Sequence, residues 1–564
     1  MRRLATAVAA ALVVLSVVAP AAALPTADGG GAAAGPSTAP TNGSASAPVQ
    51  TSGDAPPDPD GDRLGWENGY WYNESIDVDA SDGLDDAEME AVVARSMARV
   101  EVVRGLEFER TVSVEVLTRE EFRAENREGF NDTTESDGLH QNVKYEALFM
   151  VNETTDAVAV QRRNRGASVG GFYDPREERI VVVSENAESP RVDEITLSQE
   201  LFHALQDQKF NLSGYNQSTR ERHNAIDGIV EGDGNYVDYL YQQRCELSSD
   251  DPDYWGDCLE DVPGGNASGG GELANFGIYL VVYQPYSDGP PFVRGLHRER
   301  GWEAVNAIYE DPPASTEQTI HPEKYGEDAQ TNVSLEDRSN ERWRPLTVNG
   351  SVDYAELGEA GLASMFIYPA YDPRVREPLV PPEQFLNTNE SGDVDRFDPL
   401  NYSSRYSAGW DGDRLQPYVT DESAETNETG YVWKLAWDSP DEAEEFAEGY
   451  RRLLELRGAE RVGENTYVIP EDGGDGFADA FHVTVEGNTT TVVNAPSVEE
   501  LSDVDGSIDP QTGENASGTD SGDGTGSGSD GDGGTSDGAG PGFGPVAAVV
   551  ALAAGALLAL RRVE

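Results

Sequence analysis

The sequence predicts an α+β fold, in which helices and strands occupy separate stretches of the chain. Residues 85–104 show the spacing of an amphipathic helix and are followed by alternating valines. A hairpin pattern near residues 171–183 directly precedes two further helical segments. The last part of the chain reads strand, helix and then several strands. Mixed but segregated elements of this kind are typical of α+β proteins.

The first helix is expected over residues 85–104. One apolar face is formed by residues at helical spacing: Met89, Val92, Val93, Met97 and Val100. Alternating valines over residues 112–116 predict a strand. Aromatic and β-branched residues at 171–173 and 179–183 flank a turn that contains Asp174-Pro175, and so predict a hairpin. Helices are expected next over residues 193–208 and 222–242.

The C-terminal part predicts a smaller α+β subdomain over residues 341–498. A strand is expected from about residue 428, a helix over 440–457, and strands near 466–468, 480–486 and 490–493. Residues 64–498 are long for a single core, so residues 64–340 are expected to form a larger N-terminal domain.

The charge of the chain bears on its environment. Asp and Glu number 104, Lys and Arg 40, and the formal net charge is −64. Self-repulsion of this size destabilises a compact state at low salt. Molar salt shortens the Debye length to ~3 Å and removes the repulsion. The composition is therefore typical of a halophile, and it excludes nucleic acid as a partner because no basic patch is visible.

The two ends of the chain predict export and anchoring. Residues 1–24 combine a basic start, a short apolar run and small residues, which is typical of a secretory signal peptide. Residues 25–63 are expected to be a disordered linker, and residues 499–540 an acidic disordered stalk. Residues 541–564 hold a short apolar segment followed by Arg561-Arg562, an anchor with its basic end in the cytoplasm.

The tripeptide Pro541-Gly542-Phe543 makes the C-terminal prediction more specific. It resembles the PGF-type sorting signal of archaeal surface proteins, which a membrane transpeptidase called an archaeosortase reads. The resemblance implies that the mature chain ends near Pro541 and carries a lipid. An ordinary transmembrane tail anchor is the alternative, and either places the protein on the extracellular face of the membrane.

An extracellular position gives two further predictions. Cys245 and Cys258 lie close together in an exported chain, which favours a disulfide over a metal site. Asn-x-Ser/Thr sites recur along the chain, as at Asn73, Asn211 and Asn332, and predict a surface glycoprotein.

The helix expected over residues 193–208 differs by one residue from a metal-binding motif. In His-Glu-x-x-His, two histidines on one helix face bind zinc and the glutamate acts as general base. Here Glu200 and His203 are present, but Gln199 stands at the first ligand position. The next helix places His223, Asp227 and Glu231 at intervals of four, which is equally typical of a solvated helix face.

Several segments in one order resemble bacterial and archaeal zincin-like proteins. They are 199–208, Glu231-Gly232-Asp233, 315–325, 409–414 and 437–439. The resemblance implies a zincin-like domain in which the hairpin precedes the motif helix, as in gluzincin metallopeptidases. It implies that Glu200 is the catalytic base, that His203 and Glu231 are zinc ligands, and that His321 lines the site.

Gln199 departs from the zincin pattern and leaves two functions open. A neutral amide oxygen is a weaker zinc ligand than imidazole, so zinc is weakly supported as a cofactor. His223 is a possible substitute ligand. The first hypothesis is an inactive, surface-anchored domain with a binding or envelope role and with surface-layer or peptide partners. The alternative is an active zinc-dependent surface peptidase with an altered ligand set.

Overall fold

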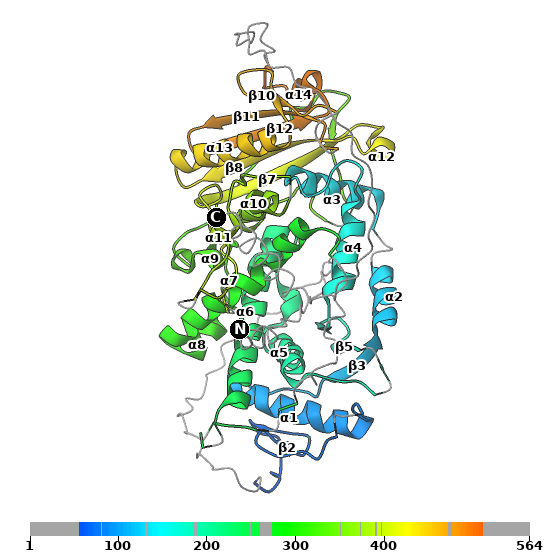
Figure 1. Ribbon diagram of the computed structural model, residues 1–564, viewed down its shortest axis with the longest axis vertical. Coiled ribbons are helices and arrows are strands. Elements are labelled where there is room, and N and C mark those ends of the chain that lie inside the picture. The colour runs from blue at the N-terminus through cyan, green and yellow to red at the C-terminus, as the bar shows by residue number, and fades with distance from the viewer. Residues whose placement is uncertain are drawn as a thin grey trace, which may run out of the picture.

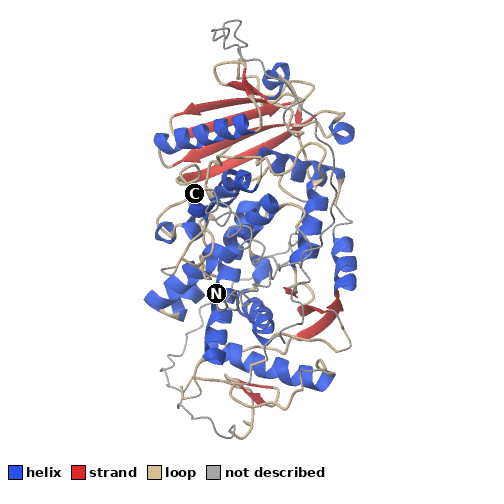
Figure 2. Ribbon diagram, in the orientation of Figure 1, coloured by secondary structure: helices blue, strands red, loops and turns tan. Residues whose placement is uncertain are grey.

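The computed structural model describes residues 56–510, except 80–81, 130–132, 185, 188, 249, 252, 257, 260–272, 350, 373, 390–391, 396 and 472–475 (Figure 1). The predicted signal peptide, the C-terminal sorting signal, and most of the linker and the stalk lie outside these residues. The expected α+β architecture is confirmed. Figure 2 shows most strands gathered in one sheet at one end of the long axis, with most helices below it.

The N-terminal part is mainly helical. Its helices are α1 (Asp86–Arg104), α2 (Arg119–Gly129), α3 (Glu135–Ala147), α4 (Ala157–Ser168), α5 (Glu194–Phe210), α6 (Arg220–Glu246), α7 (Phe276–Arg300), α8 (Trp302–Ala307) and α9 (Glu317–Ile320). Its strands are β1 (Trp66–Glu67), β2 (Tyr70–Trp71), β3 (Ser113–Thr118), β4 (Gly171–Asp174) and β5 (Arg179–Ser184). Short 3₁₀ turns are η1 (Leu212–Gly214) and η2 (Pro322–Lys324).

The expected hairpin is present as β4 and β5. The two strands pair antiparallel, with Phe172 opposite Val181, and β3 adds to β5 in parallel. Asp174 stabilises the turn because its carboxylate accepts a hydrogen bond from the backbone N–H of Arg176 (2.9 Å). Strands β4 and β5 of this three-stranded sheet pack directly against the motif helix α5.

Helices α6 and α7 cross at a point where neither has side chains. Gly228 and Gly232 of α6 face Gly289 of α7. A Cβ atom on Gly232 would lie 2.5 Å from the backbone of Gly289, so any larger residue would force the helices apart. This close approach brings polar side chains of α7 within reach of α6.

The predicted disulfide between Cys245 and Cys258 is present, with a Cα–Cα distance of 5.8 Å. It lies beside Glu194 at the start of α5. That carboxylate is fully buried and accepts hydrogen bonds from Arg95 (2.9 Å), Arg99 (2.6 Å) and the Tyr241 hydroxyl (2.5 Å). The start of the motif helix is therefore fixed to α1 and α6.

The C-terminal part is built on a seven-stranded antiparallel sheet in the order β6-β7-β8-β12-β11-β10-β9 (Figure 1). The strands are β6 (Arg344–Pro345), β7 (Trp410–Val419), β8 (Gly430–Trp437), β9 (Glu460–Arg461), β10 (Thr466–Val468), β11 (Ala480–Glu486) and β12 (Thr489–Ala495). The helices are α10 (Gly358–Ile367), α11 (Pro382–Phe385), α12 (Ser423–Thr426), α13 (Pro440–Leu456) and α14 (Val498–Val504), with the 3₁₀ turn η3 (Tyr368–Tyr371).

Both faces of this sheet are covered by helices, and side chains along β8 alternate between the two faces. Trp433 and Trp437 pack with Phe446 and Tyr450 of α13. Val432 belongs to the cluster on the other face, which α14 closes. The helix predicted over residues 440–457 and the strands expected around it are confirmed.

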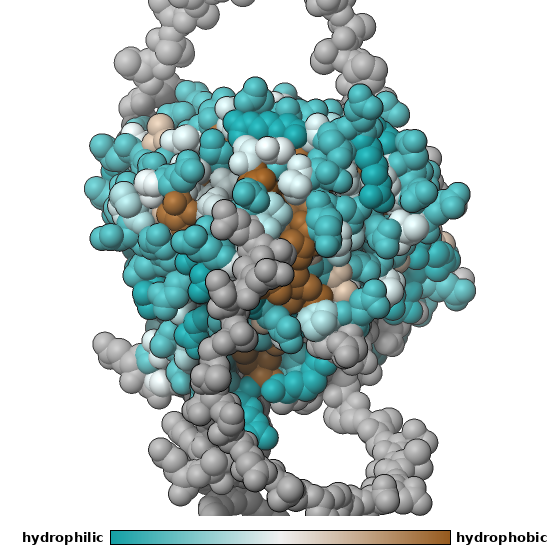
Figure 3. Space-filling view, turned by 90° about the horizontal axis from the view of Figure 1, so that it is seen from above, coloured by the Kyte–Doolittle hydropathy of each residue, from teal (hydrophilic) through white to brown (hydrophobic). Residues whose placement is uncertain are grey.

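The predicted start of the stalk, residue 499, is wrong by several residues. Residues 498–504 form α14 because Leu501 and Val504, two apolar side chains in an acidic segment, are fully buried against the sheet. The face seen from above in Figure 3 is largely hydrophilic, with a narrow apolar strip near its middle. That surface agrees with the net charge of −64.

The β1–β2 hairpin rests on α1 through two carboxyl groups. Glu101 is fully buried and accepts hydrogen bonds from the backbone N–H groups of Gly65 (2.7 Å) and Phe108 (2.8 Å). Burial, and then the charge of Glu101, raise the pKa of Glu67 to about 9. Burial also raises the pKa of Glu101 to about 7. The two groups titrate as a pair that holds a proton at neutral pH.

This pair predicts a pH-dependent stability. Because both folded-state pKa values lie above the ordinary value of 4.5, the folded state retains protons that the unfolded state loses. We expect the free energy of unfolding to fall from about pH 5 to about pH 9, by at most ~1.4 kcal/mol per pH unit for each proton. Thermal melts at constant high salt measure this, and Glu67→Gln should flatten the dependence. Glu90→Gln, on the exposed face of α1, is the control, and equal slopes in both variants would rule out the shared proton.

Candidate functional site

The motif helix α5 directs polar side chains into the protein interior. It begins at Asp193, whose carboxylate accepts a hydrogen bond from the N–H of Thr196 (2.8 Å). Gln199, Glu200 and His203 are 3%, 0% and 0% exposed. Buried polar groups are costly unless they have partners, so a helix face of this kind indicates a built site or its remnant.

His203 of α5 and Glu231 of α6 are brought together, as the zincin resemblance implies. The His203 Nε2 and Glu231 Oε2 atoms lie 3.4 Å apart, and the Glu231 side chain is also buried. Glu231 Oε1 accepts a hydrogen bond from the Tyr286 hydroxyl of α7 (2.8 Å). The two facing atoms, Nε2 and Oε2, have no hydrogen-bond partner of their own.

Gln206 fixes the orientation of the His203 ring. Its amide nitrogen donates to the carbonyl of Val230 (2.9 Å) and to the hydroxyl of Tyr309 (2.6 Å). Both amide hydrogens are thereby used, so Gln206 Oε1 must be the acceptor for His203 Nδ1 (2.7 Å). The Nδ1 atom therefore carries a hydrogen, and Nε2 is the atom turned toward Glu231.

This geometry requires a cation between His203 and Glu231. A neutral ring with its hydrogen on Nδ1 would point the Nε2 lone pair at a carboxylate in a buried site, which is repulsive. A proton satisfies the pair. Burial lowers the pKa of His203, but the charges of Glu231 and Glu200 outweigh burial and raise it to about 9.

A metal ion fits the same two atoms. Zinc binds histidine nitrogen and carboxylate oxygen at ~2.0–2.2 Å in a tetrahedron, which places two ligand atoms roughly 3.4 Å apart. The observed distance of 3.4 Å matches that spacing. Gln199 precedes His203 by one helical turn on the same helix and is buried, and its amide nitrogen has no hydrogen-bond partner. His203 and Glu231 thus offer two atoms at a spacing that zinc accepts, and a Gln199 amide oxygen would be a weaker ligand than either.

Glu200 lies beneath the hairpin. Gly171 of β4 is its neighbour, and a Cβ atom there would lie 3.6 Å from Glu200 Oε1. The carboxylate is fully buried, so it is closed to solvent as well as to a substrate.

A second buried pair supports the site from α1. Arg104 donates from Nε (3.1 Å) and Nη2 (3.0 Å) to the carboxylate of Asp233 on α6. Tyr309 donates its hydroxyl hydrogen to the same carboxylate (2.9 Å) and accepts from Gln206. A continuous chain of hydrogen bonds therefore runs from Arg104 to His203. Sequence reasoning did not single out these supporting residues, although Gln206 and Asp233 lie inside the segments that carry the resemblance.

Glu231-Gly232-Asp233 acquires a physical meaning in this arrangement. The Glu231 carboxylate faces His203. Gly232 lacks a side chain and so allows α7 to approach closely, and Asp233 forms an ion pair with Arg104. Gly234 completes the series, because a Cβ atom there would lie 2.9 Å from His203 Cε1.

His223, the possible substitute ligand, is engaged elsewhere. Its Nδ1 lies 2.9 Å from Gln217 Oε1, and its Nε2 lies 3.0 Å from Asp227 Oδ2. Both ring nitrogens thus have partners, so His223 offers no free ligand atom in this structure.

His321 belongs to the junction between the two parts of the protein. Its Nε2 lies 3.1 Å from Glu359 Oε1 of α10. Nearby, Thr316 donates to Glu221 of α6 from its N–H (2.5 Å) and from its hydroxyl (2.8 Å). The segment 315–325 therefore connects α6 to the C-terminal part.

Lys324 completes this junction. Its ammonium group lies 2.5 Å from Glu317, 3.0 Å from Asp328 and 2.6 Å from Asp438, which follows β8. The three carboxylates cluster closely enough to hold a metal ion. Because the Lys324 ammonium already contacts all three carboxylates, we assign the cluster to a salt-bridge network between the two parts.

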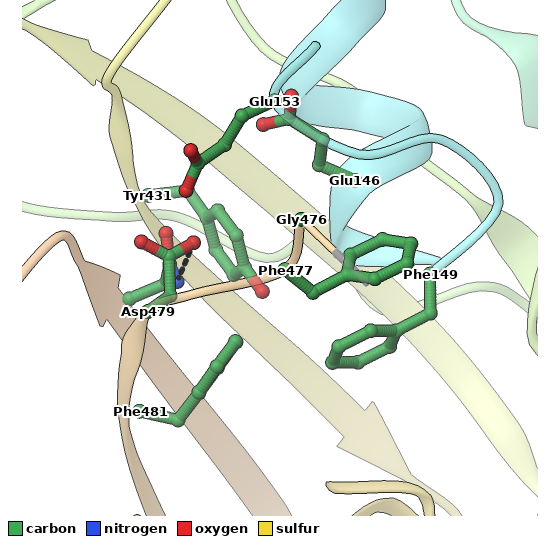
Figure 4. A pocket seen from close by; sticks show the side chains of 9 residues that line it. Glu146, Phe149, Glu153, Tyr431, Gly476, Phe477, Asp479 and Phe481 are labelled. Atoms are coloured by element: carbon green, nitrogen blue, oxygen red, sulfur yellow. Dashed lines mark hydrogen bonds between the residues drawn. The ribbon is translucent and has the colours of Figure 1, made fainter. Parts of the chain in front are cut away.

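A separate hollow lies between the end of α3 and the C-terminal sheet (Figure 4). It is lined by carboxyl groups and rings: Glu146, Glu153, Asp479, Phe149, Phe477, Phe481 and Tyr431, with Gly476 and Asn494. Burial, and then Glu153, raise the pKa of Glu146 to about 8. None of the predicted site residues lines this hollow.

The comparisons with known proteins cover the C-terminal part alone. Residues 344–505 match a family model described as a domain of unknown function (DUF8575). The chain matches none of the curated proteins and none of the solved structures with which it was compared. Within the described residues, each helix is too short or too polar to cross a bilayer. The apolar runs of residues 1–24 and 541–564 lie outside that description.

Proposed function

We propose that this chain is an exported protein, held at the outer face of the cell membrane by its C-terminal end, whose zincin-like domain binds a partner without hydrolysing it. The order of elements supports the zincin assignment: the β4–β5 hairpin, the motif helix α5, and then α6 with Glu231. The α5–α6 pairing of His203 with Glu231 supports it further.

The observation that carries the proposal is the closure of the polar cluster. A peptidase must admit a peptide carbonyl and a water molecule to its metal and general base. Here Glu200 and His203 are 0% exposed and Glu231 is 1% exposed. Gln199 in place of a histidine removes a strong ligand as well. Closure and a weak ligand both oppose hydrolysis.

An active zinc-dependent peptidase with an altered ligand set is the second candidate. It is favoured by the contact between Gln206 and His203 Nδ1, because metal-binding histidines commonly have such a partner on the other nitrogen. His203 and Glu231 would hold the metal, and zinc would supply Lewis acidity there.

Export and anchoring rest on the terminal segments. The signal-like residues 1–24 and the tripeptide Pro541-Gly542-Phe543 support processing by an archaeosortase-type transpeptidase and a C-terminal lipid. The partners we propose for the folded part are peptides or surface-layer components, consistent with a strongly acidic surface that repels nucleic acid.

Metal content and peptidase activity decide between the two candidates. The full-length chain, purified in high salt, should contain no stoichiometric zinc and should leave unfolded protein substrates intact. Zinc that is lost in His203→Ala but retained in the control His223→Ala, with cleavage that is lost in Glu200→Gln, would establish the peptidase instead. Mass spectrometry of the mature chain tests the anchor, because residues beyond Pro541 should be missing.

A further inference from the structure

The Asn-x-Ser/Thr sites of this chain lie in two different structural environments. An N-linked saccharide is attached to the Nδ2 atom of asparagine, and the Ser or Thr hydroxyl two residues later belongs to the recognised sequence. The saccharide is bulky and belongs on a surface. A site is therefore compatible with the folded protein only where Nδ2 is free of interior contacts and the hydroxyl is accessible.

Asn216 meets both conditions. It lies in the connection between α5 and α6, and both Asn216 and Ser218 are exposed. The neighbouring Tyr215 fixes this connection to the protein, because its hydroxyl donates to the carbonyl of Tyr309 (2.8 Å). Asn216 Oδ1 accepts a hydrogen bond from the backbone N–H of Ser218 (3.2 Å), whereas Nδ2 donates to no residue in the described part of the chain.

Asn332 meets the same conditions in a different part of the chain. The residues on either side of it are fixed: the Thr331 hydroxyl donates to Asp411 Oδ2 (2.6 Å), and Val333 is buried. Asn332 and Ser334 are both exposed. Among the residues that the structure describes, none accepts a hydrogen bond from Asn332 Nδ2.

Asn427 has the same sequence pattern but the opposite environment. Its Nδ2 donates to Glu146 Oε1 (3.3 Å) and to the Glu153 carbonyl (2.7 Å), so both amide hydrogens are used. Its Oδ1 accepts from Asn142 (2.9 Å), and Thr429 is buried. Glu146 and Glu153 line the hollow in Figure 4, so the Asn427 amide is directed into the protein. A sugar on Nδ2 would displace these contacts and leave their acceptors unpaired.

Asn488 is also unsuitable, although it is exposed in the turn between β11 and β12. Its Nδ2 donates to the carbonyl of Trp437 (2.9 Å). The hydroxyl of its recognition sequence belongs to Thr490, which is 0% exposed and donates to the carbonyl of Ala443 (3.1 Å). That hydroxyl is closed to any enzyme that acts on the folded chain.

We propose that Asn216 and Asn332 carry N-linked saccharides, and that the fold excludes them from Asn427 and Asn488. In each transfer, Nδ2 forms a bond to C1 of a sugar whose donor is a lipid-phosphate-linked saccharide. The bond between C1 and the phosphate oxygen breaks, the lipid phosphate leaves, and the amide loses one hydrogen as a proton. This inference rests on the export proposed above, because such sites are modified in secreted chains.

Mass spectrometry of peptides from the mature chain, recovered from the cells that produce it, tests the assignment without a variant. Peptides that contain Asn216 or Asn332 should be heavier by a saccharide, and those that contain Asn427 or Asn488 should have the mass of the plain sequence. Saccharide on Asn427 or Asn488 would overturn the proposal. So would a bare Asn216 or Asn332 in a chain that has lost residues 1–24.

An unmodified chain that retains residues 1–24 gives a different result, because it would overturn the export proposal together with this one. The two failures are therefore distinguished by the N-terminal peptide of the same sample.

Two substitutions at one site test whether the recognised sequence directs the modification. Asn216→Gln removes the acceptor nitrogen, and Ser218→Ala removes only the hydroxyl and keeps the Asn216 amide. Each should lower the mass of the mature chain by one saccharide. Asn488→Gln is the matched control and should change the mass by the substitution alone. A saccharide that remains on Asn216 in Ser218→Ala would contradict the proposal.

Discussion

Replacing Arg104 with glutamine is expected to lower the free energy of unfolding by ~3–5 kcal/mol, because it leaves Asp233 buried without its counter-charge. Arg104 and Asp233 are both 0% exposed, and salt cannot screen them. A loss of this size is a large share of the stability of a typical folded domain, which is about 5–15 kcal/mol. Thermal or urea unfolding at high salt measures it, and Asp233→Asn should give a similar loss.

Arg405→Gln is the matched control for this prediction. Arg405 contacts Glu445 (2.9 Å) and Glu448 (2.9 Å) with half of its side chain exposed, so its loss should cost ~0–1 kcal/mol and less at high salt. If Arg104→Gln proves no more damaging than Arg405→Gln, the buried chain from Arg104 to His203 does not hold the site together.

The substitution Gln199→His is expected to create zinc binding that the wild type lacks. It restores the third strong ligand beside His203 and Glu231, whose facing atoms already have the spacing of a zinc tetrahedron. At a zinc concentration a hundred times the dissociation constant, the free energy of unfolding should rise by about 2.7 kcal/mol. Melting curves with and without zinc, together with elemental analysis, measure this gain.

Gln208→His provides the same substitution on the same helix at a distant position. The Gln208 side chain faces the backbone of Glu109 and Arg110, not the His203 pair. Zinc should stabilise Gln199→His alone. If both variants respond alike, the zinc is bound by histidine in general, and the zincin reading of α5 and α6 fails. Peptide cleavage is not expected to return, because Glu200 remains enclosed.

Local sequence patterns were sufficient for the elements that carry the site. The helices around Gln199 and Glu231, and the hairpin turn at Asp174, follow from spacing and turn chemistry within short windows. Helix α7 could not be predicted in this way. It runs from Phe276 to Arg300 through Pro285, Pro290 and Pro291, because its buried surface outweighs the local preference against proline.

The partners of the site residues were less predictable than the residues themselves. Arg104 and Asp233 lie 129 residues apart, and no local pattern links them. For His223 the spacing gives only part of the answer. A helical spacing of four correctly places His223 beside Asp227, but it does not reveal that the two side chains contact each other and leave the His223 Nε2 atom already engaged. Only the tertiary structure shows that the Glu231 carboxylate faces His203, whereas His223 and Asp227 on the same helix contact each other.

The Lys324 network sets a limit on where this protein can be divided. The family model begins at residue 344, but Asp438 within it is neutralised by Lys324, which lies before that boundary. His321 reaches Glu359 across the same line. A fragment cut at residue 344 would lose Lys324 and His321, and would leave Asp438 and Glu359 without these partners. The segment that recurs between proteins is thus smaller than the segment that must fold together here, and expression fragments should begin upstream of α9.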